Sequence, residues 1–323
     1  MELNKKASIL FLISVILFLG LSVVLGFFSG IDPNLFYLLN SLAISIPAFL
    51  IPAIIFRRKY KLPRSGAPTA AMVLLAIGLG VGCIFMNQSL SYLTEAIFGN
   101  IRVVSNSTTS ETIMGLDLWV MVIALAIVPP ISEELIMRGT LLECWRRYSP
   151  VGALVLTSVL FGLLHAAPSS LLIYMGLGLL LGSVYLITRN YWLCMIIHLI
   201  NNLVSVIGAV IMQQYGGAEA AAEEASEAVS WMSPAVPYFI LFILSGIMAA
   251  AIILPLMILL KNHCMKNRLG KYSEAALSEA QAPIAEGEAA PALMRDPVLW
   301  IAILLLVLIN LFSGLMEFGV IQL

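Results

Sequence analysis

Three charged side chains stand within the otherwise apolar stretch PPISEELIMRGT at residues 129–140: Glu133, Glu134 and Arg138. A charge near the centre of a membrane span costs about 2.5–3.5 kcal/mol on insertion scales, so such a group requires a neutralising partner or a function. On a helix, Glu134 and Arg138 share a face, whereas Glu133 is turned from Glu134 by about 100°. We therefore predict that Arg138 neutralises Glu134 and that Glu133 faces something else. The two leading prolines are expected to bend the helix and make room for Glu133.

Two histidines and an asparagine are the expected partners of Glu133. Of the 3 histidines, His263 lies in KNHCMK among lysines and is expected to be solvated, while His165 and His198 stand in apolar segments. Counted from the basic ends of their helices, Glu133, His165 and Asn202 lie at depths of about 21, 22 and 20 Å. His198 lies one helical turn before Asn202 on the same face. We therefore expect Glu133, His165, His198 and Asn202 to line one cavity.

These side chains are suited to activating water, and two chemistries are open. Glu133, His165 and His198 supply the ligand types of a hydrolytic zinc site with an open position for water. Alternatively, Glu133 and one histidine activate water without a metal, while the other histidine and Asn202 donate hydrogen bonds to an oxyanion. Zn²⁺ and metal-independent activation are equally compatible with these residues. HExxH and GxSG motifs are absent, and the aspartates stand only at the ends of spans, which disfavours other intramembrane protease classes.

The composition identifies the elements that must position these residues. The 323-residue chain is 61% hydrophobic and 11% charged, with a mean hydropathy of +1.00, which is too apolar for a soluble protein. Because lipid offers no hydrogen-bond partners and barrel-type alternation is absent, membrane spans here must be helices. We predict an all-α, polytopic transmembrane helical bundle of about nine spans. They lie near 7–29, 35–56, 66–98, 117–145, 151–167, 169–187, 191–213, 236–260 and 297–319.

The distribution of lysine and arginine predicts how the bundle is oriented. With the N-terminus inside, all of the 17 basic residues fall in internal segments except Arg102, which is external, and Arg138, which is within a span. The external segment 213–230 carries glutamates and no lysine or arginine. Short basic loops stay in the cytoplasm, so we predict an N-in, C-out arrangement.

The remaining composition limits the partners. A net charge of −1 gives no electrostatic basis for binding nucleic acid, so we expect none. The 4 cysteines are scattered without a CxxC pair and are expected to be buried apolar fillers rather than disulfides or metal ligands. The Ala-, Glu- and Pro-rich stretch near 261–296 is predicted to be a flexible linker.

Three motifs occur in order, each on its own predicted helix. The motifs are EExxxR (Glu133, Glu134, Arg138), FxxxH (Phe161, His165) and HxxxN (His198, Asn202). Together they resemble the CPBP family, the CAAX prenyl protease 2-like and bacteriocin-processing intramembrane proteases also called the Abi family. The resemblance covers roughly residues 118–208, a core of four helices.

The resemblance implies roles for these residues. Glu133 would activate water with His165, while His198 and Asn202 would hold the oxyanion. The supporting residues would be Glu134, Arg138 and Phe161. The family is commonly labelled a metalloprotease, yet its prenyl-protein members resemble glutamate-dependent enzymes, so the resemblance leaves the metal open.

The resemblance further implies an intramembrane endopeptidase, a hydrolase acting on a membrane-associated peptide or protein that is lipidated in some relatives. We divide the chain into N-terminal helices (1–116), a catalytic core (117–213) and C-terminal helices with the linker (214–323). We expect an integral protein of the bacterial plasma membrane. The alternative is a non-catalytic membrane immunity factor, scaffold or regulator that binds a peptide through the same cavity. A transporter is disfavoured because no inverted repeat is visible.

Overall fold

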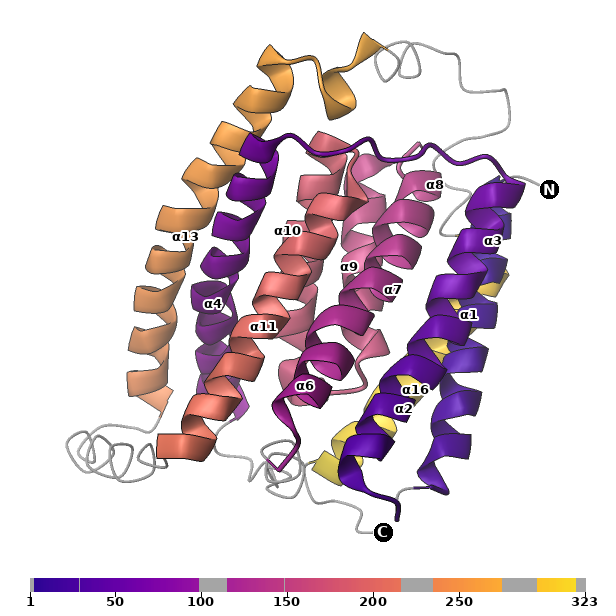
Figure 1. Cartoon of the computed structure of the whole chain (residues 1–323), viewed down its shortest axis with the longest axis vertical. Helices are drawn as coiled ribbons and strands as arrows, with labels where there is room; N and C mark the ends of the chain where they lie inside the picture. The colour runs from indigo at the N-terminus through magenta and orange to yellow at the C-terminus, as the bar shows by residue number, and fades with distance from the viewer. Residues whose placement is uncertain are drawn as a thin grey trace.

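The computed structural model describes residues 3–28, 30–98, 115–147, 149–215, 235–274 and 295–317, and every regular element within them is helical (Figure 1). Eight helices of this part are long and apolar enough to cross a membrane. The chain is therefore an integral membrane protein built as a polytopic helical bundle. Seven of these spans are α1 (Leu3–Gly26), α2 to α3 (Pro33–Lys59, with the π-helical stretch Ile46–Leu50 between them), α4 (Ala70–Phe98), η4 to α10 (Pro168–Thr188), α11 (Tyr191–Tyr215), α13 (Ala235–Lys266) and α16 (Pro297–Glu317).

The remaining full-length span carries the PPISEELIMRGT stretch and contains two π-helical interruptions. It is a continuous helix from Leu118 to Trp145. Its parts are α6 (Leu118–Met121), the π-helical turn η2 (Val122–Ile127), α7 (Val128–Ile136), the π-helical η3 (Met137–Leu142) and α8 (Glu143–Trp145). The regular α-helix assumed for this segment is thus interrupted on both sides of the acidic pair.

The segment predicted as a fifth full span, 151–167, is shorter than expected. It forms α9 (Pro150–Leu164), whose 15 residues rise about 22 Å, less than the roughly 30 Å of bilayer hydrocarbon. The helix stops because Pro168 drives Ala167 to an extended conformation (φ −126°, ψ 86°) and Ala166 turns the chain with φ 47°. The predicted nine spans therefore become eight full-length helices and one short one.

The double proline explains how the fourth span is fastened to its neighbours. Residues 129–130 have no N–H, so in the π-helical register the carbonyls of Ala124 and Leu125 lose their helical donors. The Ser41 hydroxyl donates to the Ala124 carbonyl at 2.7 Å. The Asn202 side-chain amide donates to the Leu125 carbonyl at 2.9 Å. The prolines thus create two acceptors that join α2 and α11 to this span.

Small residues allow α4 to pack closely between α11 and α13. A Cβ atom on Gly80 would lie 2.7 Å from the Ile200 side chain of α11, and one on Gly82 would lie 2.9 Å from Ile253 of α13. Close backbone approach through glycine is a common means of helix association in membranes. All 4 cysteines are buried and free, which confirms that they act as apolar fillers.

Two predicted segments fall largely outside the described residues. The acidic segment 213–230 is described only to Tyr215, where α11 ends. Of the predicted linker near 261–296, the first part is not a linker, because α13 continues to Lys266 and a 3₁₀ turn, η5, spans Gly270–Tyr272. Residues 275–294 of that stretch lie outside the described part of the chain.

Candidate active site

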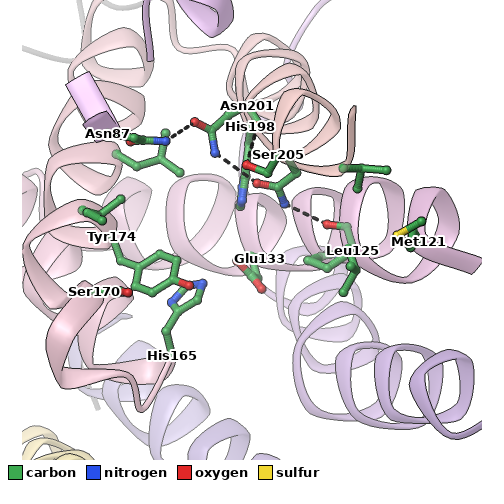
Figure 2. A pocket seen from close by; sticks show the side chains of 15 residues that line it. Asn87, Met121, Leu125, Glu133, His165, Ser170, Tyr174, His198, Asn201 and Ser205 are labelled. Atoms are coloured by element: carbon green, nitrogen blue, oxygen red, sulfur yellow. Dashed lines mark hydrogen bonds between the residues drawn. The ribbon is translucent and has the colours of Figure 1, made fainter. Parts of the chain in front are cut away.

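The structure brings the four residues that were expected to share a cavity to the same one. This cavity, about 620 Å³ in volume, lies between α4, the fourth span, α10 and α11. Glu133 comes from α7, His165 follows α9, and His198 and Asn202 come from α11. Figure 2 shows Glu133 between the His165 ring on one side and His198 on the other. The other lining residues include Asn87, Pro129, Ser170, Tyr174, Asn201 and Ser205.

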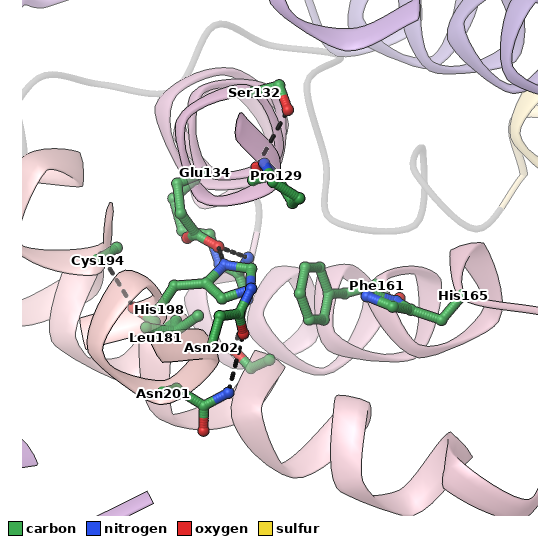
Figure 3. Close-up of polar contacts among 12 residues, drawn as sticks. Pro129, Ser132, Glu134, Phe161, His165, Leu181, Cys194, His198, Asn201 and Asn202 are labelled. Carbon is green, nitrogen blue, oxygen red and sulfur yellow. Dashed lines mark hydrogen bonds and ion pairs between the residues drawn. The ribbon is translucent and has the colours of Figure 1, made fainter. Parts of the chain in front are cut away.

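The predicted ion pair behind Glu133 is present, and it also holds a histidine. Arg138 Nη1 lies 2.8 Å from Glu134 Oε1, with both side chains fully buried. The same oxygen accepts a hydrogen bond from His198 Nδ1 at 3.0 Å, as Figure 3 shows. Because a carboxylate on one ring nitrogen sets the tautomer and orientation of a histidine, His198 presents Nε2 to the cavity. Sequence reasoning assigned Glu134 only to Arg138 and missed this second role.

Phe161 and Gly178 complete the surroundings of Arg138. The guanidinium lies over the Phe161 ring at 4.7 Å, and its Nη2 donates to the Gly178 carbonyl at 3.1 Å. Gly178 admits this contact because α9 and α10 nearly touch there, and a Cβ would lie 2.9 Å from Ser158 Cα. Phe161 is therefore the floor of the charged cluster, which is the supporting position expected for it.

His165 occupies the end of a helix rather than its interior. Its backbone N–H bonds to Gly162, so the Phe161 carbonyl is left for the ring, and Nδ1 lies 2.8 Å from that oxygen. A carbonyl only accepts, which places the ring proton on Nδ1 and leaves Nε2 with a lone pair. The ring stacks on Tyr174 at 3.7 Å between centroids, with 15° between planes. His165 is thus oriented from two directions.

The donor set does not form a ready zinc site. In the part of the chain that the structure describes, no three His, Cys, Asp or Glu side chains form a group able to hold a metal ion. Glu133, His165 and His198 line one cavity but are not gathered around a single point of it. The three residues considered as zinc ligands therefore do not fit a preformed three-ligand centre.

The helices that form most of this cavity match a known protein family. Residues 115–204 match a family model described as type II CAAX prenyl endopeptidase Rce1-like. This match supports the resemblance of residues 115–204 to the CAAX protease (CPBP) family. No curated protein and no solved structure matches the chain. The matched range contains every residue of the three motifs, so the CAAX protease core coincides with the cavity-forming helices.

A helix outside the matched range also shapes the cavity. Asn87 of α4 donates to Asn201 Oδ1 at 2.7 Å, and Asn201 Nδ2 donates to Asn202 Oδ1 at 3.1 Å. Asn202 Nδ2 in turn donates to the Leu125 carbonyl, so hydrogen bonds fix both the oxygen and the nitrogen of its amide. The second hydrogen on Nδ2 is left to donate to a group in the cavity. Sequence reasoning missed Asn87 and Asn201. The polar run in the third span and the doubled asparagine of HLINN were the available signals.

The helix α16 holds the turn that carries His165. Asn310 of α16 donates to the Leu163 carbonyl at 2.7 Å, and the same carbonyl accepts from the Ala166 N–H at 3.2 Å where α9 ends. The Glu317 carboxylate accepts from the Ser169 hydroxyl and, at 3.3 Å, from its backbone N–H. A flanking helix with no recognisable motif therefore helps to hold a motif residue.

Proposed function

We propose that this chain is an intramembrane endopeptidase that hydrolyses a peptide bond in a membrane-associated peptide or protein, with Glu133 as the residue that activates water. The resemblance of residues 115–204 to the CAAX protease family supports the reaction class. The observation that supports the role of Glu133 is its carboxylate oxygen Oε2, which is buried, has no hydrogen-bond partner among the described residues and belongs to a residue that lines the cavity. A buried acceptor without a partner is costly unless water or substrate occupies the site.

Each of the other residues has a proposed task that fits its hydrogen bonds. A water molecule bound by Glu133 and by the Nε2 lone pair of His165 attacks the carbonyl carbon and passes one proton to Glu133. The oxyanion that forms accepts a hydrogen bond from Asn202 Nδ2, and His198 Nε2, held in place by the bond from Nδ1 to Glu134, faces the same position. Glu133 then gives its proton to the leaving nitrogen, and the peptide bond breaks to an acid and an amine.

The proposed orientation places the basic end of the bundle in the cytoplasm. The last turn of α3 carries Arg57, Arg58 and Lys59, and it lies at the end of the bundle where α1 begins and α8 and α13 end (Figure 1). Since basic ends stay inside, this supports the N-in, C-out orientation. A bacterial plasma membrane and a lipidated substrate remain parts of the proposal.

The decisive experiment compares peptide termini in host membranes that contain equal amounts of the wild type or of Glu133→Gln. New termini should appear only with the wild type, and in H₂¹⁸O each new carboxyl terminus should gain one heavy oxygen. Identical sets of termini would contradict the protease assignment. If Glu133→Gln also restored the phenotype of a deletion strain, the cavity would serve binding rather than catalysis.

Metal removal gives a second expectation. Because Glu133, His165 and His198 form no ready three-ligand centre, cleavage by the purified protein should persist after dialysis against a strong chelator, within about twofold of the untreated rate. The measurement is the initial rate before and after chelation, with metal content determined on the same samples. Loss of activity that returns with Zn²⁺ alone would contradict metal-independent activation.

The chain of amides gives a third expectation. Asn87→Leu should lower kcat by about tenfold with little change in KM, since it loosens Asn202 rather than removing it, and loss of a whole oxyanion donor costs roughly 10²–10³. Gln88→Leu is the matched control, because Gln88 is exposed on the next position of α4 and takes no part in the amide chain. Equal effects of both variants would assign the loss to α4 packing instead.

A further inference from the structure

A second cavity lies on the other side of α7 from Glu133. It measures about 770 Å³ and is bounded by α3, α7 and α11. Its α7 wall consists of Ile131 and Leu135, which are turned by about 200° from Pro129 and Glu133 respectively. Four basic residues surround one end, and apolar side chains form the rest of the wall. The basic residues are Arg57, Arg58, Lys61 and Arg64.

Arg57 is the unusual member of this group. It is only 8% exposed, its Nη2 donates to the Pro63 carbonyl at 2.5 Å, and its guanidinium lies 4.9 Å from the centre of the Tyr191 ring. Its Nη1 is buried and has no hydrogen-bond partner among the described residues. The other two buried arginines of the described chain, Arg138 and Arg146, each face a carboxylate. A buried guanidinium without a carboxylate beside it is costly, and an anion bound next to it would offset that cost.

The four basic residues at the end of this cavity, here called the basic rim, follow a helix end whose backbone is fixed by hydrogen bonds. α3 ends in a turn in which Leu62 N–H bonds to Arg57 at 3.0 Å and Lys61 N–H to Arg58 at 3.4 Å. Lys61 adopts φ 49°, the left-handed conformation that closes such a helix end and that glycine usually supplies. A lysine in this left-handed backbone conformation is less stable than a glycine would be, and its side chain lines the cavity.

The segment that follows this turn is hydrogen-bonded to the start of α11. The Ser65 hydroxyl accepts from the Tyr191 N–H at 3.1 Å, and Asn190 donates to the Gly66 carbonyl at 2.9 Å. Figure 1 shows this segment crossing the basic end of the bundle from α3 to α4. The rim is thus joined to both sides of the cavity, so its charges are arranged before a ligand arrives.

We propose that this cavity binds the phosphate of an anionic phospholipid, with one acyl chain lying along the apolar wall. The guanidinium and amines match a phosphate in charge, and arginine binds phosphate oxygens through two parallel N–H groups. Ile131 and Trp192 on the wall are 40% and 45% exposed, so the apolar part opens toward lipid. Basic pockets between helices at a membrane surface favour such head groups. A free phosphate would leave the apolar wall unused.

The test uses the purified full chain in detergent and three probes: phosphatidylglycerol, phosphatidylcholine of the same acyl chains, and inorganic phosphate. Phosphatidylglycerol should raise Tm by several degrees and remain bound in native mass spectrometry, whereas the other two should have little effect. Arg58→Gln combined with Arg64→Gln should weaken phosphatidylglycerol binding about tenfold or more, because each basic group near a phosphate contributes to attraction. Both residues are exposed, so the fold should survive.

Arg57→Lys and Arg268→Gln complete the design. Arg57→Lys keeps the charge but loses the planar fork, so it should weaken phosphatidylglycerol binding. Arg268 has a 75% exposed side chain outside the cavity, and Arg268→Gln should bind lipid like the wild type. Equal stabilisation by both lipids, or equal loss in Arg268→Gln, would overturn the site. Full stabilisation by inorganic phosphate would overturn the lipid as its occupant.

Discussion

Glu133→Gln is expected to lower the rate of peptide-bond hydrolysis by about 10³-fold or more, within the range of about 10²–10⁴ that a positioned acid or base contributes, and to leave the fold unchanged. Glutamine has nearly the same shape, so the cavity keeps its volume, but its amide cannot take a proton from water. Glu133 Oε2 has no hydrogen-bond partner among the described residues, so no such contact of Oε2 is lost. The measurement is the initial rate on a substrate peptide, together with Tm of the purified variant.

Glu95→Gln provides the matched control for this substitution. Glu95 is an exposed glutamate of α4 that does not line the cavity, so its variant should cleave at the wild-type rate. Glu133→Asp offers a further comparison, since it keeps a carboxylate but moves it back by one methylene. Glu95→Gln is purified in the same way, and the preparations are checked for contaminating protease. If Glu133→Gln then cleaves at more than a tenth of the wild-type rate, Glu133 is not the residue that activates water.

Glu134→Gln and Arg138→Met are expected to destabilise the protein by about 3–5 kcal/mol each, because either change leaves the other charge unpaired in the interior. Both side chains are fully buried and 2.8 Å apart. Glu134→Gln also weakens the contact that orients His198. The measurements are the folded fraction after size-exclusion chromatography and the Tm of that fraction. We expect reduced yield, lower Tm and reduced cleavage for both variants.

The double variant Glu134→Leu with Arg138→Met separates the two roles of Glu134. It removes both charges together, so it should regain much of the lost stability, as replaced ion pairs often do. It should not regain activity, because His198 loses its carboxylate and no longer presents Nε2 in a fixed direction. Normal yields from both single variants would contradict the ion-pair role. Active double variants would contradict the orienting role.

These two results would divide the acidic pair by function. Glu133 and Glu134 are adjacent in sequence, but helical geometry turns them into different surroundings: a cavity for Glu133, and an arginine with a histidine for Glu134. Loss of Glu133 should therefore appear in the rate alone. Loss of Glu134 should appear in both the rate and the stability.

The sequence by itself determined the features that depend on local pattern. Apolar length set the helical bundle, and spacing of four residues set the Glu134 and Arg138 pair, because neighbours on one helix are placed by a fixed rise and rotation. Depth along each helix placed Glu133, His165 and Asn202 at one level, because the rise per residue of a helix is fixed. The motifs also indicated the family, which residues 115–204 confirm.

Only the tertiary structure decided which groups meet across helices. The bond from His198 to Glu134 joins residues 64 positions apart, and the hold of α16 on the His165 turn joins Asn310 to Leu163 across 147 positions. The rotation of each helix about its own axis and the lateral order of helices set such contacts, and neither is encoded in hydropathy or local spacing. The π-helical turns beside the double proline and the early end of α9 are equally tertiary, because other helices satisfy the backbone groups that they leave open.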